Sequence, residues 1–285
     1  MICAVLLYIR TMKYLVALFL SFVLVVSASA DTYYQWVDSA DIYIDAGEWE
    51  KAEAALQNAL RLEPANAQNS LLLSNLGTVQ RYCGKYQEAL DTYSMALFMT
   101  PRSTTLLRNR AALYAEMDSL EQACADYSYL IILDDSDEDA LYNRALIYMQ
   151  QGDTTACRKD LEYMLRNNPN SSKARMGFAA FFKVQGYYHE AVEMYNQVIR
   201  DNPDMPYLYV GRAEAYILWG KTSQADKDIA RAMELTPDDP FVYILRAYSK
   251  IARYEYADAV RDIERARELG YNATTCDNLI EEIVK

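Results

Sequence analysis

The sequence predicts an all-α solenoid of stacked helical hairpins, and three observations support this prediction. Prolines recur at a spacing of 34 residues or twice that value, at Pro101, Pro169, Pro203 and Pro237. Two columns of small residues follow the same period, and large apolar residues recur between them at helical spacing. A period of this length is typical of arrays in which each repeat is one helix–turn–helix.

The period divides the chain into numbered repeats when the proline is taken as position 32. The segment "LRNRAALY" (107–114) then returns one period later as "LYNRALIY" (141–148). Pro64 lies 37 residues before Pro101, so the first repeat carries three extra residues near "ANAQN" (65–69). The predicted repeats begin near Tyr33, Ser70, Thr104, Glu138, Ser172, Pro206 and Pro240.

Positions 8 and 20 of every repeat hold a small residue. Two helices approach closely only where the side chains between them are small, so these positions predict the crossing point of each hairpin. Position 8 is Ala40, Gly77, Ala111, Ala145, Ala179, Ala213 and Ala247. Position 20 is Ala52, Ala89, Ala123, Cys157, Ala191, Ala225 and Ala259.

Glycine at position 15 in five of the repeats predicts the end of the first helix, because glycine tolerates positive φ. Proline at position 32 ends the second helix. One hairpin cannot bury its apolar face alone, so the repeats must stack. Large residues fill the stripe at positions 11 and 24: Tyr43, Tyr114, Tyr148, Phe182 and Tyr216, then Tyr93, Tyr127 and Tyr195.

This pattern resembles the tetratricopeptide repeat. The first repeat matches the family consensus at Trp36, Ala40, Tyr43, Ala52, Leu56, Ala59 and Pro64, and "NLGTVQRYCGKYQEALDTYSMAL" (75–97) fits it without a gap. The resemblance covers residues 33 to about 270. It implies a right-handed α-solenoid of about seven repeats within residues 31–285, and a protein-binding rather than a catalytic role.

The last repeat departs from the pattern. Lys250 replaces the aromatic residue, Tyr254 the glycine and Tyr271 the proline. The final segment "TTCDNLIEEIVK" (274–285) reads as one more amphipathic helix. Its apolar residues Leu279, Ile280 and Ile283 are expected to cover the last hairpin, because a solenoid needs a cap with a polar outer face.

The first thirty residues differ in composition from the rest. They lack Asp and Glu, carry Arg10 and Lys13, run apolar from Tyr14 to Val26, and end in "SASA" before Asp31. This arrangement predicts a secretory signal peptide over 1–30, cleaved near Ala30, and an exported protein that is periplasmic or extracellular. An uncleaved anchor is the alternative, although a membrane span needs ~20 apolar residues. Met12 is a second possible start.

Arginine occupies position 7, beside the crossing, in four repeats, and aspartate occupies position 23 in those same four. An unpaired, partly buried arginine is unfavourable, whereas exchanging a whole pair for apolar groups can be neutral. We therefore predict an Arg–Asp bridge between the two helices of each of these repeats; the alternative is two independent solvated charges. The pairs are Arg110 with Asp126, Arg144 with Asp160, Arg212 with Asp228, and Arg246 with Asp262.

The sequence offers no catalytic motif. It has one histidine and no nucleophile motif around it, no phosphate-binding glycine loop and no metal-ligand spacing. We expect no enzyme activity, no cofactor and no metal. Cys83, Cys124, Cys157 and Cys276 remain after residue 30, and the sequence does not decide between buried thiols and disulfides.

The resemblance places the binding surface on the first helices, at positions 2, 5, 6, 9, 12 and 13. Some family members hold a peptide carboxylate with five side chains from three repeats: two Lys, two Asn and one Arg. Arg108, Asn143 and Lys173 fill three of those five places, but Ala112 and Gly177 fill the others, so we expect that clamp to be incomplete. The candidate groove residues are Asn75, Arg108, Asn109, Tyr142, Asn143, Lys173, Tyr207, Phe241 and Tyr248. The asparagines serve either as ligand contacts or as bridges between helices.

The leading hypothesis is therefore a scaffold that binds a peptide or partner helix in this groove. The alternatives are an assembly or chaperone factor for unfolded exported chains, favoured by a broad apolar groove, and an accessory subunit that tethers an enzyme. The net charge of −12, without a dense run of Lys or Arg, argues against nucleic acid. The partner is expected to be a protein or peptide; the sequence leaves the oligomeric state open.

Overall fold

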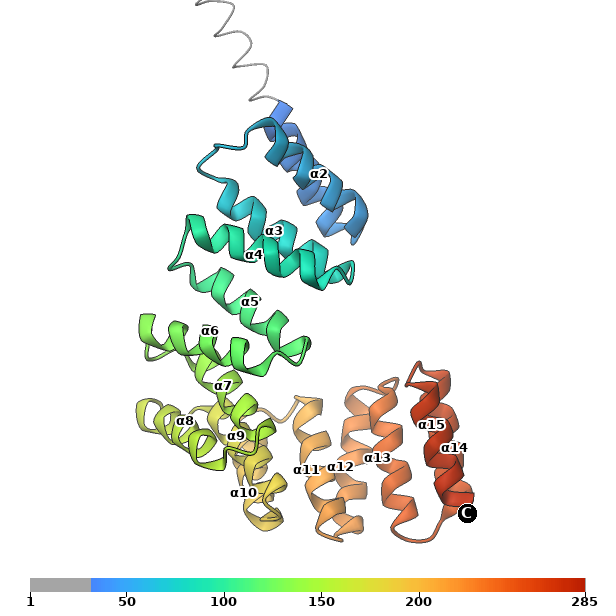
Figure 1. The fold of residues 1–285 in the computed structure, drawn as a ribbon. Helices are drawn as coiled ribbons and strands as arrows, with labels where there is room; N and C mark the ends of the chain where they lie inside the picture. Colours follow the sequence, from blue (N-terminus) through green and yellow to red (C-terminus); the bar gives the residue numbers. More distant parts are fainter. Residues whose placement is uncertain (1–31, 285) are drawn as a thin grey trace, which may run out of the picture. The chain divides into compact units, whose positions relative to one another are not determined.

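The computed structural model describes residues 32–284, and its regular elements over that range are all α-helices (Figure 1). The chain divides into two compact units, which are described separately: an N-terminal unit ending at Asp135 and a C-terminal unit beginning at Ser136. The N-terminal unit contains helical residues 32–45, α2 (Trp49–Leu62), α3 (Asn69–Tyr82), α4 (Tyr86–Met99), α5 (Thr104–Glu116) and α6 (Leu120–Leu133). The C-terminal unit contains α7 (Glu138–Gln150), α8 (Thr154–Asn167), α9 (Ser172–Val184), α10 (Tyr188–Asp201), α11 (Pro206–Leu218), α12 (Thr222–Leu235), α13 (Pro240–Ile251), α14 (Tyr256–Glu268) and α15 (Ala273–Val284).

Within each unit the helices pair in sequence order. The pairs α3–α4 and α5–α6 form hairpins in the N-terminal unit, and α7–α8, α9–α10, α11–α12 and α13–α14 form hairpins in the C-terminal unit. The second helix of a hairpin also packs on the first helix of the next, as α4 does on α5 and α10 does on α11. The architecture is an all-α helical solenoid.

One turn geometry joins the two helices of every hairpin. The residue at position 15 has a positive φ of 55–79°, and the next residue donates its backbone N–H to a carbonyl five residues earlier, at 2.8–3.0 Å. This bond satisfies a carbonyl at the end of the first helix. Asp118 and Tyr254 adopt this geometry although they are not glycine. The other residues at position 15 are Gly47, Gly84, Gly152, Gly186 and Gly220.

The columns of small residues are buried where the two helices of each hairpin cross. Every alanine at positions 8 and 20 is at most 1% exposed, as is Cys157. Gly77 has a further reason to be small, because a Cβ at this residue would lie 2.6 Å from the ring of Tyr93. Side-chain volume at the crossing therefore sets how closely the helices approach.

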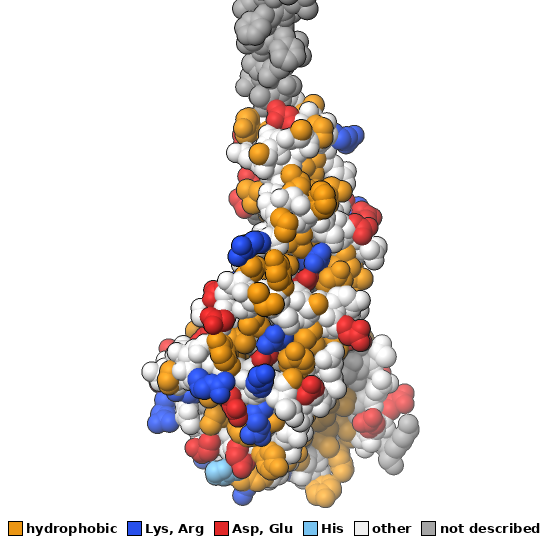
Figure 2. Space-filling model, turned by 60° about the vertical axis from the view of Figure 1, so that its left-hand side comes forward, with side chains coloured by type: hydrophobic (Ala, Val, Ile, Leu, Met, Phe, Trp, Pro, Cys, Tyr) orange, Lys and Arg blue, Asp and Glu red, His pale blue; other side chains and the backbone are white. Residues whose placement is uncertain are grey.

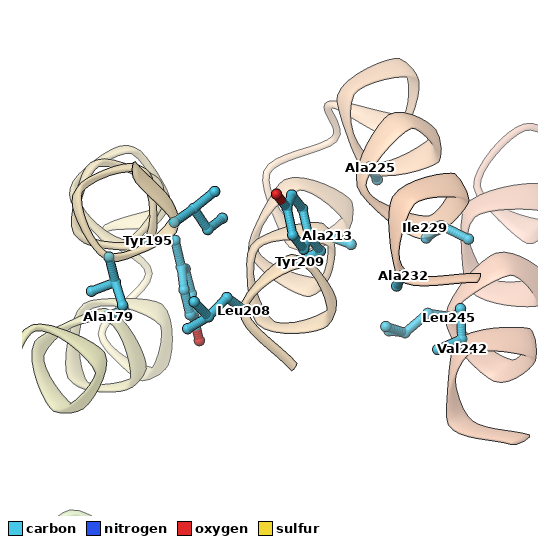
Figure 3. Close-up of a cluster of buried hydrophobic side chains, with 12 residues drawn as sticks. Ala179, Tyr195, Leu208, Tyr209, Ala213, Ala225, Ile229, Ala232, Val242 and Leu245 are labelled. Atoms are coloured by element: carbon cyan, nitrogen blue, oxygen red, sulfur yellow. The ribbon is translucent and has the colours of Figure 1, made fainter. Parts of the chain in front are cut away.

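The core continues from one hairpin to the next. In the C-terminal unit, Tyr195 and Val198 of α10 pack with Leu208 of α11, and the same cluster extends through Ile229 of α12 to Val242 of α13 (Figure 3). All of these side chains are less than 9% exposed. Because each hairpin supplies only part of its own burial, stacking supplies the rest.

The C-terminal hairpin is covered by α15. Gly270 takes the positive φ that ends α14, and Tyr271 donates its N–H to the Ala266 carbonyl at 2.9 Å, so a glycine turn stands where earlier repeats have proline. Cys276 of α15 is fully buried against Ile263 and Ala266 of α14. Leu279, Ile280 and Ile283 pack against the same cluster.

The predicted signal peptide lies outside the described residues. Over residues 32–284, no helix combines the length and the apolar character that crossing a bilayer would require.

Candidate functional site

The four Arg–Asp pairs predicted from the sequence are in contact. In each one, the guanidinium of the first helix donates two hydrogen bonds to the carboxylate of the second helix, with its Nε and one terminal nitrogen. The Nε–Oδ2 distances are 2.8 Å for Arg110, Arg144 and Arg212, and 2.9 Å for Arg246. This parallel geometry is the strong form of an arginine–carboxylate interaction.

Three of these arginines also reach the preceding hairpin, which the sequence did not predict; one of them, Arg246, donates to the Met233 sulfur of α12 at 3.2 Å. Arg110 donates to the Ser94 hydroxyl of α4 at 3.1 Å, and Arg212 donates to the Asn196 side-chain oxygen of α10 at 2.6 Å. The guanidinium therefore joins three helices. The predicted intra-repeat bridge is also a link between neighbouring hairpins.

The pairs are largely removed from water. The four aspartates are 4–7% exposed, and the Arg212 side chain is 17% exposed. The hydrogen bond to Asp126 raises the pKa of Arg110, and that to Asp262 raises the pKa of Arg246. Burial acts to lower the pKa of Arg212, but Asp228 raises it overall. These arginines have a structural role, because the aspartate of the same hairpin neutralises their charge.

The C-terminal unit contains an apolar groove between α11 and α13. Its cavity of about 370 Å³ is lined by Phe241, Tyr248 and Tyr271 together with aliphatic side chains. Phe241 is 36% exposed and Tyr248 is 41% exposed, whereas Ile244 is buried. Burial raises the pKa of Tyr248 above its usual value, and the nearby Tyr271 and Glu282 contribute in the same direction. The remaining lining residues are Glu214, Ile217, Leu218, Ile244 and Leu245.

The N-terminal unit contains a pocket of different chemistry, between helical residues 32–45, α2 and α3. Its cavity of about 510 Å³ is lined by two carboxylates, Asp41 and Asp45, and by the aromatic pair Trp49 and Tyr82. The two rings stack at 4.4 Å with planes 11° apart. The other lining residues are Ile44, Asn75, Thr78 and Val79.

The remaining groove candidates are placed as follows. Lys173 forms an ion pair with Asp139 of α7, which neutralises its charge. Tyr142 lies against Gly177. Burial raises the pKa of Tyr142, and the nearby Tyr207 contributes in the same direction.

Asn75 lines the N-terminal pocket, and Asn109 lies partly exposed on α5. Arg108 lies on α5 of the N-terminal unit, and Asn143 lies on α7 of the C-terminal unit.

Asp41 and Asp45 are the site residues that sequence reasoning missed. They occupy positions 9 and 13 of the first repeat, both of which are groove positions. Applying the groove positions to that repeat would have found them.

No metal centre is built into the described part of the chain: no group of three or more potential metal ligands occurs there. The four cysteines within residues 32–284 are free thiols. Burial raises the pKa of Cys157 to about 11, so this thiol is protonated at neutral pH.

Comparison with solved structures identifies the fold. The structure of a tetratricopeptide repeat protein from Parabacteroides merdae superposes with a TM-score of 0.80 at 36% sequence identity, over 90% of this chain and 100% of that one. The chain belongs to the tetratricopeptide repeat family. Family models of the tetratricopeptide repeat match residues 37–104 and 139–171.

More distant solved structures share the fold alone. Yeast Tom70 superposes with a TM-score of 0.59 at 14% identity, over 82% of this chain and 60% of that one. The Cut9 and Hcn1 assembly of the APC/C gives 0.63 at 12% identity, over 88% of this chain and 55% of that one. A search of curated proteins found no match. The tetratricopeptide repeat fold typically serves as a non-catalytic scaffold that binds proteins or peptides.

Proposed function

We propose that the protein is a scaffold that binds a peptide or partner helix along the first helices of its repeats. One observation carries this proposal: both cavities are lined mainly by groove positions. In the C-terminal groove these positions supply Phe241, Tyr248 and Ile217, and in the N-terminal pocket they supply Asp41, Asp45 and Tyr82. Exposed aromatic side chains at such positions are the usual anchors of polypeptide recognition.

The shape of the cavities favours binding of a defined segment over a chaperone role. An unfolded-chain chaperone would need a broad apolar surface. Here the apolar cavity between α11 and α13 is about 370 Å³, a neighbouring cavity of about 430 Å³ beside α14 and α15 shares Tyr248 with it, and the N-terminal pocket carries charge. This groove suits one apolar or aromatic anchor of a short peptide or helix.

Selection from a displayed random-peptide library on the full chain tests the proposal. Affinity of the selected peptides is measured by fluorescence anisotropy for the parent chain and for Phe241→Glu. Glu is suitable because residue 241 lies in the first turn of α13, where an acidic side chain is compatible with the helix dipole. Lys227→Glu, on the exposed surface of α12, is the surface control and changes the charge by more than Phe241→Glu does.

We expect Phe241→Glu to weaken binding about tenfold and Lys227→Glu to leave it unchanged. Failure to enrich any peptide, or equal binding by both variants, would contradict the proposed function.

We also propose that the protein is exported, on the strength of residues 1–30 alone. Mass spectrometry of the N-terminus of the protein made in its own host tests this proposal. A mature chain beginning at Asp31 supports cleavage near Ala30, whereas retention of residues 13–30 argues against it.

A further inference from the structure

The pocket of the N-terminal unit has an unusual charge arrangement. Asp41 and Asp45 are one helical turn apart on the same helix face, where like charges repel. Asp45 also lies in the last turn of helical residues 32–45, where the helix dipole disfavours a negative charge. Both terms are unfavourable to the free protein, and a bound cation would relieve both.

Two nearby glutamates form ion pairs, whereas Asp41 and Asp45 form none within residues 32–284. Glu48 pairs with Lys51 at 2.7 Å, and Glu53 pairs with Lys85 at 2.9 Å. In the described part of the chain, Asp41 and Asp45 have neither an ion pair nor a side-chain hydrogen bond. The pocket therefore presents about two negative charges to its occupant.

The aromatic side of the pocket selects the type of cation. Trp49 and Tyr82 stack on one another and both line the cavity, and Tyr82 is 63% exposed. A cation over an aromatic face is attracted to it, and arginine also stacks on such faces. No group of three or more potential metal ligands occurs in the described part of the chain, so this pocket suits an organic cation better than a metal ion.

We propose that this pocket binds a cationic side chain, arginine or lysine, of the polypeptide that occupies the groove. The inference rests on the proposed function and adds to it the chemistry of one anchor residue. The carboxylates pair with the guanidinium or ammonium group, the Trp49–Tyr82 pair packs against it, and Asn75 and Thr78 supply polar contacts to the segment.

Fluorine NMR on the full chain labelled with 5-fluorotryptophan tests the inference. The chain has three tryptophans, so replacing Trp36 and Trp219 with Phe assigns the Trp49 resonance. The probes are blocked pentapeptides of four alanines around a central arginine, lysine, citrulline or glutamate. Citrulline has the shape of arginine without its charge. Magnesium and calcium chloride are titrated separately.

We expect the arginine and lysine peptides to shift the Trp49 resonance to saturation, and the citrulline and glutamate peptides to bind at least about fivefold more weakly. Asp41→Asn with Asp45→Asn should weaken the arginine peptide about tenfold. The matched control, Asp91→Asn with Glu121→Gln, removes the same charge from exposed positions of the same unit and should bind as the parent does.

Equal shifts by citrulline and arginine, or undiminished binding by the Asp41 and Asp45 variant, would overturn the inference. So would saturation by either metal ion at lower concentration than the arginine peptide. If the library selection yields binding peptides but no probe shifts the Trp49 resonance, only the proposed cation pocket is refuted. Failure of both experiments refutes the proposed function as well.

Discussion

Two neighbouring hairpins of the C-terminal unit solve the same packing problem with opposite chemistry. In α11–α12, Arg212 and Asp228 form a buried ion pair across the crossing, and Asn196 adds a third contact. In α9–α10 the same positions hold Phe178 and Met194. Phe178 is 7% exposed and stacks on Phe182 at 5.7 Å. The backbone thus accepts either pair, provided that both partners change together.

The strongest test of this comparison removes one partner of the Arg212–Asp228 pair and leaves the other in place. Asp228→Ala leaves the Arg212 guanidinium enclosed without its carboxylate, so we expect a loss of about 3 kcal/mol in the free energy of unfolding. Chemical denaturation followed by circular dichroism measures it.

The matched swap is Arg212→Phe with Asp228→Met, which copies α9–α10 into α11–α12. It should stay within about 1 kcal/mol of the parent. A swap as damaging as Asp228→Ala would show that the two hairpins are not interchangeable.

A second test sharpens the contrast between α3–α4 and α5–α6, which have Gly77 and Ala111 at the same crossing position. Gly77→Ala places a methyl group 2.6 Å from the Tyr93 ring. Overpacking should outweigh the gain in helix propensity, giving a loss of about 1–2 kcal/mol in unfolding free energy.

Removing the obstructing ring provides the control for Gly77→Ala. In a Tyr93→Leu background, the same change should cost markedly less. Additive effects of the two substitutions would contradict the steric account.

The turns offer a smaller and stabilising effect. Tyr254 holds φ at 63° and Asp118 at 55°, where the other hairpins have glycine. Tyr254→Gly should raise the unfolding free energy by about 1 kcal/mol, because a left-handed backbone strains a residue with a Cβ. Asp118→Gly should gain less, since aspartate tolerates this region better. Thermal denaturation checks both, and Gly84→Ala, which should destabilise, is the reverse control.

An effect of similar size that depends on pH concerns Cys157, which stands where the other repeats have alanine. Its pKa is raised to about 11 by burial, and a thiol in the unfolded chain ionises near 9. The unfolded state therefore releases its proton first, and stability falls as pH rises from about 9 to 11. Relative to Cys157→Ala, the parent should lose about 1 kcal/mol at pH 10 compared with pH 7. Equal pH dependence of the two chains would rule this out.

The sequence predicted the parts of the fold that each repeat carries within itself. Small residues at the crossing, the glycine turn and the Arg–Asp pairs concern two helices of one hairpin, so a period and a column of residues suffice. The family resemblance was sound, but the number of repeats and export stay predictions.

Contacts between hairpins were harder to predict. The bond from Arg110 to Ser94 and the pair of Lys173 with Asp139 depend on how neighbouring side chains meet after stacking. The stacking of Trp49 on Tyr82 in the N-terminal pocket was missed for the same reason, because the two residues come from different hairpins. Tyr254 shows a further limit, since a residue unsuited to a turn was held there by the surrounding structure.

The bond from Arg212 to Asn196 has a consequence for how the array comes apart. In a one-dimensional stack, the energy at each boundary decides whether neighbours open singly or together. A guanidinium shared by α10, α11 and α12 strengthens one such boundary and makes the two hairpins a cooperative block. Amide hydrogen exchange should therefore report α9 to α12 opening as a single step.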